Sequence, residues 1–259
     1  MNSIRQHPSF PQPEDPSATI WRYMDFYKFS WIVECGRLLM PSADRLGDPL
    51  EGTRPAGDLD WWSREAANAI SDDHRRIIEH NCELITRFAT SFRSNYYVSC
   101  WHMNPLENAD MWPIYTTQPE SVAIWSTYAT LREILPKYVD MGKVRYIDYI
   151  TEPIPRMNMF EYITHKNAAP YSFECEVRAI ASSPSIKKYG GDHFTENLFE
   201  SEATKGFRVY APKIDVLRLT QGVVLHPEAS AAFEVEINNF CARYKLPQPV
   251  SSRFRKDLP

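Results

Sequence analysis

Residues 173–180 read FECEVRAI, and the interpretation of the whole chain depends on this stretch. Neighbouring side chains of a β-strand point to opposite faces, so a strand here would separate its apolar residues from its charged ones. The apolar face would hold Phe173, Cys175, Val177 and Ala179, and the charged face Glu174, Glu176 and Arg178. The charged row is then either an ordinary solvated face or two carboxylates and a guanidinium that line a site.

β-Branched and aromatic residues, which are typical of strands, are concentrated in several further segments. These segments are 19–25 (TIWRYMD), 96–102 (YYVSCWH), 121–127 (SVAIWST), 143–150 (KVRYIDYI) and 221–227 (QGVVLHP). Together with residues 173–180 they predict a sheet of several strands.

Apolar residues at helical spacing predict helices over 26–35, within 61–93 and over 227–244. Asp25 is placed to cap the first helix and Gly36 to end it, and Pro227 lies near the first turn of the last helix. The helices do not alternate regularly with the strands, as a doubly wound sheet would require. We therefore predict an α+β fold, a single mixed domain with a central, largely antiparallel sheet and flanking helices. Residues 1–18 are polar and proline-rich and are expected to be flexible, which leaves 19–259 as the domain.

The composition excludes several classes of protein. The 29 basic and 33 acidic residues give a formal charge of -4, so there is no general attraction to nucleic acid or to an anionic membrane. The five cysteines form no C-x-x-C pair, which favours a reducing, cytoplasmic setting over a disulfide framework. No window has the roughly 20 apolar residues of a membrane span, and the N-terminus has no apolar signal segment.

Common catalytic motifs are also missing from the sequence. There is no Walker A loop, G-x-G-x-x-G, H-E-x-x-H or G-x-S-x-G motif, and no two histidines have metal-ligand spacing, so no metal site is predicted. His102 is interpreted as a hydrogen-bonded residue at a strand end rather than a ligand. Cys100 is interpreted as a small buried side chain, since a nucleophilic thiol needs a base beside it.

Aromatic residues gather in the middle of the chain: Tyr96, Tyr97, Trp101, Trp112, Tyr115 and Trp125. Flat side chains fill protein cores, and they also stack on planar bases and nicotinamide rings. Most of these residues are expected in the core. Trp101 and Tyr115 are the better ligand candidates, because each lies near polar residues at the end of a predicted element.

Several blocks of the chain, taken in order, resemble a known bacterial family. They are WRYMDFYKFSWIVECGRLLMPSADRLGDPLEG, YVSCWH, MWPIY, VRYIDY and HKNAAPYSFECEVRAI. Their sequence is similar to that of the domain-of-unknown-function 2971 family over most of the chain. The more specific pieces are the D-P-x-E loop at Asp48, Pro49 and Glu51, and Lys166 followed by the E-x-E-x-R of Glu174, Glu176 and Arg178. The chain departs from the family at Leu46-Gly47-Asp48, where Phe-Asn-Asp is common. The family name states no activity, so this resemblance implies a related fold rather than a function.

A second resemblance implies a mechanism. Arg22 and Tyr23, then Ser99, then Glu174 and Glu176 follow the order found in ADP-ribosyltransferases of the arginine-serine-glutamate type. This chain departs from that pattern because Ser99 has no Ser-Thr-Ser run and Arg22 precedes the tyrosine.

The second resemblance implies that NAD is the substrate and that ADP-ribose passes to an acceptor. Glu176 would stabilise the oxocarbenium-like ribose, and Glu174 would orient or deprotonate the acceptor. Arg22 would bind the pyrophosphate, Ser99 would position a ribose, and Trp101 or Tyr115 would stack on a ring. The expected cofactor-binding residues are thus Arg22, Tyr23, Ser99, Trp101 and Tyr115. The acceptor is protein, nucleic acid or water, and the biological role would be that of a toxin or a phage-defence effector.

Two other functions remain open from the sequence. In a non-enzymatic interaction module, the charged row would be a solvated strand face and the aromatic residues core or a partner groove. In a nucleic-acid-acting defence enzyme, the same carboxylates would work with a metal. Asp48 precedes Pro49, so it is expected to start a turn and to accept backbone hydrogen bonds. Together with Lys166, Asp48 is expected to serve the fold or the mouth of the site more than the chemistry.

Overall fold

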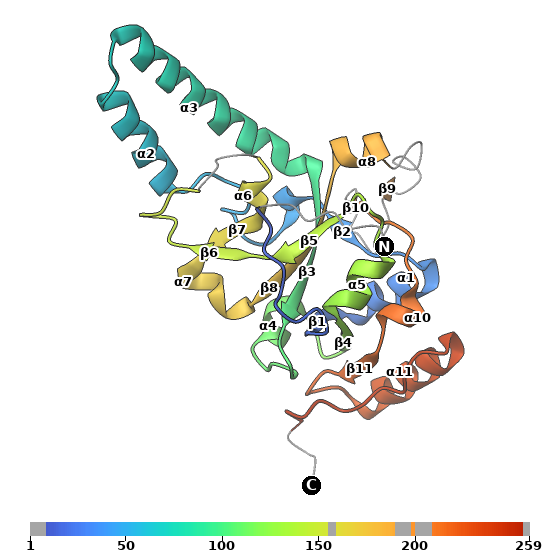
Figure 1. Ribbon diagram of the computed structural model, residues 1–259. Helices are drawn as coiled ribbons and strands as arrows, with labels where there is room; N and C mark the ends of the chain where they lie inside the picture. The colour runs from blue at the N-terminus through green and yellow to red at the C-terminus, as the bar shows by residue number, and fades with distance from the viewer. Residues whose placement is uncertain (1–8, 155–158, 190–197, 200–208, 256–259) are drawn as a thin grey trace.

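The computed structural model describes residues 9–154, 159–189, 198–199 and 209–255. Its centre is a six-stranded antiparallel sheet with the order β11-β4-β1-β3-β8-β5 (Figure 1). The strands are β1 (Thr19–Asp25), β3 (Tyr96–Met103), β4 (Ser121–Thr127), β5 (Asp140–Lys143), β8 (Glu176–Ser182) and β11 (Gly222–Leu225). The predicted α+β fold with a central antiparallel sheet and flanking helices is confirmed.

The sheet consists of two halves that meet over a short distance. β1 pairs with β4 along its whole length, from Thr19↔Thr127 to Asp25↔Ser121, and β3 pairs with β8 from Tyr96↔Ser182 to His102↔Glu176. Between β1 and β3, in contrast, the described residues pair only at Ile20↔Met103 and Trp21↔His102. Beyond these pairs the two strands separate, and a gap opens inside the sheet.

Two small sheets accompany the central one. β2 (Met40–Pro41), β10 (Val209–Tyr210) and β9 (Leu198–Phe199) form the first, and β6 (Arg145–Ile147) pairs in parallel with β7 (His165–Asn167) in the second. Residues 143–150, predicted as one strand, are thus divided between β5 and β6. Residues 173–175 are not part of a strand, because β8 begins at Glu176 and the short 3-10 helix η3 (Ser172–Glu174) precedes it.

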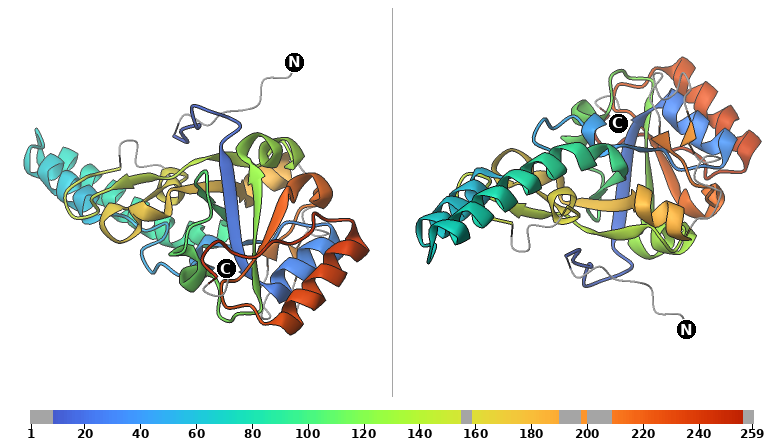
Figure 2. Two further views of the ribbon diagram at one scale, coloured as in Figure 1. Left: turned by 90° about the horizontal axis from the view of Figure 1, so that it is seen from below. Right: turned by 90° about the horizontal axis from the view of Figure 1, so that it is seen from above.

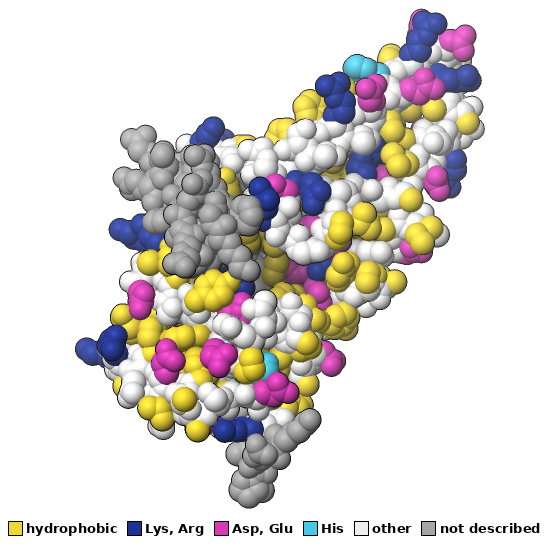
Figure 3. Space-filling view, turned by 180° about the vertical axis from the view of Figure 1, so that it is seen from behind, with side chains coloured by type: hydrophobic (Ala, Val, Ile, Leu, Met, Phe, Trp, Pro, Cys, Tyr) yellow, Lys and Arg dark blue, Asp and Glu magenta, His cyan; other side chains and the backbone are white. Residues whose placement is uncertain are grey.

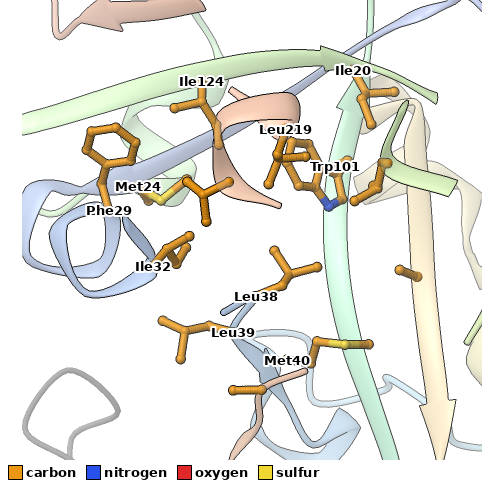
Figure 4. Packing of buried hydrophobic residues seen from close by; sticks show 14 of the residues in the cluster. Ile20, Met24, Phe29, Ile32, Leu38, Leu39, Met40, Trp101, Ile124 and Leu219 are labelled. Atoms are coloured by element: carbon orange, nitrogen blue, oxygen red, sulfur yellow. The ribbon is translucent and has the colours of Figure 1, made fainter. Parts of the chain in front are cut away.

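Helices cover the half of the sheet formed by β1, β4 and β11. They are α1 (Phe26–Cys35), α5 (Tyr128–Ile134), α10 (Val216–Leu219) and α11 (Ala231–Tyr244), and Figure 2 shows α1 beside α11. As predicted, α1 follows Asp25 and ends at Gly36, whose left-handed conformation (φ 62°) favours glycine. The Asp25 side chain does not cap the helix as expected, because its carboxylate accepts hydrogen bonds from Thr117 N–H and Ser121 Oγ instead. α11 starts later than predicted, because Ser230 caps it by accepting the Phe233 N–H, and Pro227 lies outside the helix. These helices bury a large apolar core against the sheet, part of which is drawn in Figure 4.

A helical hairpin projects from the other half of the molecule (Figures 1 and 2). Its arms are α2 (Ala56–Ala67) and α3 (Asp72–Phe92), and Ser71 caps α3 by accepting the His74 N–H. On the face shown in Figure 3, basic and acidic side chains are intermixed along the hairpin. The remaining short helices are α4 (Met111–Tyr115), α6 (Glu161–Thr164), α7 (Ala168–Tyr171) and α8 (Ser183–Tyr189), with 3-10 turns η1 (Ala43–Arg45) and η2 (Arg93–Asn95). None of the helices in the described ranges combines the length and the apolar character that a bilayer crossing requires.

Part of the N-terminal segment expected to be flexible packs on the domain. Phe10 is only 2% exposed and meets the ring of Phe160 edge to face. The side chain of Gln12 donates a hydrogen bond to the Met141 carbonyl oxygen of β5. Residues 9–12 therefore belong to the packed structure, whereas residues 1–8 lie outside the described residues.

We expect Phe10→Ala to lower the free energy of unfolding by about 3 kcal/mol, because it leaves a cavity beside Phe160. Urea denaturation of the purified protein measures this change. Ile70→Ala is the control, since Ile70 is 91% exposed and its loss should change stability by less than about 0.5 kcal/mol. Equal effects of the two substitutions would show that residues 9–12 do not pack on β5.

Candidate functional site

A cleft of about 700 Å³ opens where β1 and β3 separate. Its volume lies within the range of small-molecule sites. The walls come from β1, β3, α1, the loop before α2, Tyr115 of α4 and the segment from Lys166 to Arg178. Among the residues predicted to form the site, those that line the cleft are Arg22, Tyr23, Trp101, Tyr115, Glu174 and Glu176. The strand separation therefore brings together residues that are far apart in the sequence.

The guanidinium of Arg178 lies at the base of one wall, completely buried. It donates to both oxygens of Glu51 (2.6 and 2.8 Å) and to both oxygens of Glu176 (2.8 and 3.0 Å). A fifth hydrogen bond, of 2.6 Å, goes to the carbonyl oxygen of Ile163. Such paired, charge-assisted bonds hold the carboxylates in fixed orientations. Of the two interpretations of the charged row, the solvated strand face does not hold, because Glu174, Glu176 and Arg178 are all buried.

The loop that carries Glu51 is shaped by its own sequence. The carboxylate of Asp48 accepts the Leu50 N–H at 2.8 Å, which confirms the predicted turn. Gly52 follows in the left-handed conformation (φ 67°), and a Cβ atom at this position would lie 2.6 Å from the side chain of Ile163. A glycine is therefore needed for the loop to approach the segment before β7.

Lys166 of β7 joins the two carboxylates of the E-x-E motif. Its ammonium lies 2.7 Å from Glu174 Oε2 and 3.5 Å from Glu176 Oε2. The ring of Tyr171 covers the ammonium, with the centroid 4.1 Å from Nζ. Glu174 reaches this position because Cys175 adopts a left-handed conformation (φ 42°), which breaks the strand alternation expected from the sequence.

The environment separates the acidities of these carboxyl groups. Burial would raise the pKa of Glu176, but Arg178 and Lys166 outweigh it and hold the pKa at about 2. At Glu174, burial prevails over Lys166, and the pKa lies above its usual value. Burial likewise raises the pKa of Glu51 despite Arg178. The cleft thus offers one firmly ionised carboxylate, Glu176, beside a carboxyl that takes up a proton more readily, Glu174.

Arg22 presents a further cation to the cleft, on β1. Its guanidinium donates to Ser99 Oγ and to the Leu39 carbonyl oxygen, each at 3.0 Å, and lies 5.7 Å from the centre of the Trp101 ring. Within the described residues, no carboxylate lies within ion-pair distance of Arg22. Burial lowers the pKa of Arg22 to about 10, which leaves it charged at neutral pH. An unpaired, half-buried guanidinium in a cleft is suited to an anionic ligand.

Ser99 is not where the sequence interpretation placed it. Its side chain is fully buried and accepts hydrogen bonds from Arg22 and from Trp101 Nε1. Because Ser99 lies behind Arg22 and does not line the cleft, it cannot hold a ribose there. Its role in this structure is to orient the guanidinium of Arg22.

Of the aromatic residues predicted to bind a ligand, two are packed within the protein and one is partly exposed. Tyr23 and Trp101 border the cleft, but with exposures of 4% and 1% most of each ring is packed within the protein. Tyr23 packs on Trp112 and accepts the Asn108 N–H, and Figure 4 shows Trp101 within the core. Tyr115 is partly exposed, and its hydroxyl pKa is raised by burial and by Glu176 and Glu174. Tyr115 is therefore the candidate that has a surface to offer a ligand.

On β3, His102 matches its sequence interpretation, whereas Cys100, expected to be buried, is only partly buried and lines the cleft. His102 Nδ1 lies 2.6 Å from the Glu174 carbonyl oxygen, and burial lowers the pKa of the imidazole, so His102 is a hydrogen-bonded residue at the strand end. Burial and Glu176 raise the pKa of the Cys100 thiol well above its usual value. Cys100 is thus held as a neutral thiol, which is a poor nucleophile.

No catalytic or binding role was predicted for Glu51 or Arg178, and Lys166 was expected to serve the fold or the mouth of the site. The available signal was the D-P-x-E and E-x-E-x-R motifs, since their charged residues bind one another across the fold. No group of three or more His, Cys, Asp or Glu side chains in the described part of the chain is arranged to hold a metal ion. The carboxylates that would be candidates already accept hydrogen bonds from Arg178 or Lys166.

Comparison with known proteins identifies similar solved structures but no family. No protein-family model matches the chain, and no curated protein does. The chain is similar to DarT of Thermus sp. 2.9 in complex with NAD+, with 8% identity and a TM-score of 0.36, covering 93% of this chain and 98% of that one. It is also similar to the same protein in complex with carba-NAD+, with 10% identity and a TM-score of 0.33, covering 93% and 97%. At these TM-scores the likeness carries no information about the site, and membership of the domain-of-unknown-function 2971 family stays a prediction.

We expect Arg178→Met to lower the free energy of unfolding by about 3 to 5 kcal/mol, because Glu51 and Glu176 would remain buried without their partner. Chemical denaturation at neutral pH measures the loss. Arg218→Met is the matched control: Arg218 pairs with Glu133 at 2.6 Å on the exposed surface, where such pairs contribute about 0 to 1 kcal/mol. Similar losses in both variants would contradict the buried network.

The low pKa of Glu176 predicts a dependence of stability on pH. A carboxyl whose pKa falls from 4.5 to about 2 on folding stabilises the protein above pH 4.5, and this contribution is lost as the pH falls toward 2. Between pH 6 and pH 3, wild type should therefore lose about 2 kcal/mol more than Glu176→Gln, which has no carboxyl to titrate. Denaturation curves of both proteins over this range measure the difference. Parallel curves would show that Glu176 is not held ionised.

Proposed function

We propose that the cleft binds NAD and that the protein is an ADP-ribosyltransferase-like enzyme. One observation carries the proposal: the unpaired cation Arg22 and the ionised carboxylate Glu176 line the same cleft of about 700 Å³. NAD cleavage needs both charges, since the pyrophosphate is anionic and the ribose becomes cationic as nicotinamide departs. Neither charge alone would favour this substrate over other nucleotides.

The residues present suit the substrate and its chemistry. Arg22 would bind the pyrophosphate, held in orientation by Ser99 and Leu39. Tyr115, which is partly exposed and lines the cleft, offers aromatic surface for a planar ring. Glu176 faces the cleft with its charge fixed by Arg178, so it would stabilise the oxocarbenium ion without becoming protonated.

In the transfer step, the acceptor supplies the electron pair for the new bond and Glu174 takes up the acceptor proton. The bond between ribose C1′ and the nicotinamide nitrogen breaks, and its electron pair leaves with neutral nicotinamide. A lone pair of the acceptor forms the new bond to C1′, and the acceptor proton passes to Glu174. Glu174 is suited to this because its pKa is raised, and among the described residues nothing donates a hydrogen bond to its Oε1. With water as the acceptor, the same step is NAD hydrolysis.

We expect NAD to stabilise the purified protein against heat. At about 100 times Kd the stabilisation is roughly 2.7 kcal/mol, which appears as a shift of several degrees in the melting temperature. Arg22→Ala should abolish the shift, whereas Arg218→Ala, on the exposed surface, should keep it. Glu176→Gln should keep binding but lose nicotinamide release, measured by chromatography, by at least about a hundredfold.

The same measurements distinguish the proposed function from the two other functions, an interaction module and a nucleic-acid-acting enzyme. A non-enzymatic module has no reason to respond to NAD, and a metal-dependent nuclease should respond to magnesium or manganese instead. The absence of any thermal shift at millimolar NAD, together with no nicotinamide release over hours, would refute the proposed function.

A further inference from the structure

We infer that Lys166 is a positioning residue: its ammonium holds the carboxylates of Glu174 and Glu176 side by side and keeps Glu174 ionised. This inference rests on the function proposed above. Lys166 comes from β7, which belongs to the small parallel sheet rather than to the central sheet that carries Glu176. Its buried ammonium reaches across to both carboxylates, at 2.7 and 3.5 Å. The pairing of Glu174 with Glu176 is therefore made by a third segment of the chain.

The contacts of the Lys166 ammonium do not suit it to bind the substrate. Its contacts are two carboxylates and the face of Tyr171, 4.1 Å away. Although burial lowers the pKa of Lys166, Glu176 and Glu174 raise it above its usual value, so Nζ stays charged. Because its contacts already include two anions, Lys166 is poorly placed to bind the substrate pyrophosphate. That task is left to Arg22.

The two carboxylates depend on Lys166 to different degrees. Glu176 has a second cation, Arg178, which binds both of its oxygens. Within the described residues, Glu174 has a hydrogen bond from Lys166 and from no other cation. Removing the ammonium should therefore change Glu174 strongly and Glu176 weakly.

The remaining charged and titratable groups do not replace Lys166. Those that interact with its ammonium are Glu51, Cys100, Tyr171, Glu174, Glu176 and Arg178, and Asp48 interacts with Tyr171. Tyr115 and Tyr146 lie beside the two carboxylates. Arg178 is the one further cation in this set, and its hydrogen bonds go to Glu51, Glu176 and Ile163. Without Lys166, Glu174 would be a buried carboxyl beside a carboxylate, which favours its protonated form.

The consequence concerns the acceptor step. Glu174 must be ionised to take the acceptor proton, so the loss of Lys166 should move the acidic limb of the pH–rate profile upward. Lys166→Arg keeps a positive charge and should return the acidic limb to the pH at which it lies in the wild type. A merely structural role of Lys166 would lower stability or rate at all pH values without moving the limb.

The test follows the carboxyl groups directly, by NMR titration of protein labelled with ¹³C at glutamate carboxyls. Glu174→Gln and Glu176→Gln identify the two signals. In Lys166→Met the Glu174 midpoint should rise by about one pH unit or more while the Glu176 midpoint stays low, and Lys166→Arg should reverse the rise. Lys166→Gln serves if the methionine variant does not fold. An unchanged Glu174 midpoint, or equal shifts of both groups, overturns the inference.

A second measurement keeps this inference apart from the proposed function. The titration needs no NAD, whereas the pH profile of nicotinamide release does. A shifted Glu174 midpoint in a protein that never releases nicotinamide supports the pairing and contradicts the proposed function. Nicotinamide release with an unmoved acidic limb and an unmoved midpoint contradicts the pairing and supports the proposed function.

Discussion

Burying the guanidinium of Arg178 with every N–H group satisfied is the constraint on which the rest of the site depends. A guanidinium has five N–H donors, and five hydrogen bonds to Glu51, Glu176 and Ile163 account for them. The acceptors come from the loop before α2, from β8 and from the end of α6. Since a buried charge with a missing partner is costly, these three segments must be in place together, and the cleft wall is formed as a unit.

Local signals were enough to predict most of the fold. The β-branched and aromatic residues of 19–25 and 96–102 predicted the strands β1 and β3, and Gly36 ends α1 as expected, because both effects act over a few residues. What could not be predicted is long-range. The separation of β1 from β3 depends on pairings made elsewhere in the sheet, and the packing of Phe10 depends on Phe160.

The site was predictable as a set of residues and less so as a geometry. Glu174, Glu176 and Arg22 line one cleft, as their residue types suggested, but Glu51 lies 127 positions from its partner Arg178, a pairing that no local pattern encodes. Ser99 was expected to contact a ligand, whereas its hydroxyl lies behind Arg22 and accepts hydrogen bonds from Arg22 and from Trp101, which itself borders the cleft. The residue type shows that a hydroxyl or an indole is available, but the side of the guanidinium on which it lies is set by tertiary packing.

The separation of β1 from β3 also leaves two strand edges facing each other inside the molecule. Beyond Trp21 and His102 the described residues of these strands do not pair with one another, and residues of both strands line the cleft, although Ser42 bridges β3 at Tyr97. Main-chain N–H and C=O groups are present whatever the side chain is. Main-chain groups of the two strands therefore keep their places when side chains along them are substituted, so this part of the cleft is less sensitive to sequence than the charges of Arg22 and Glu176.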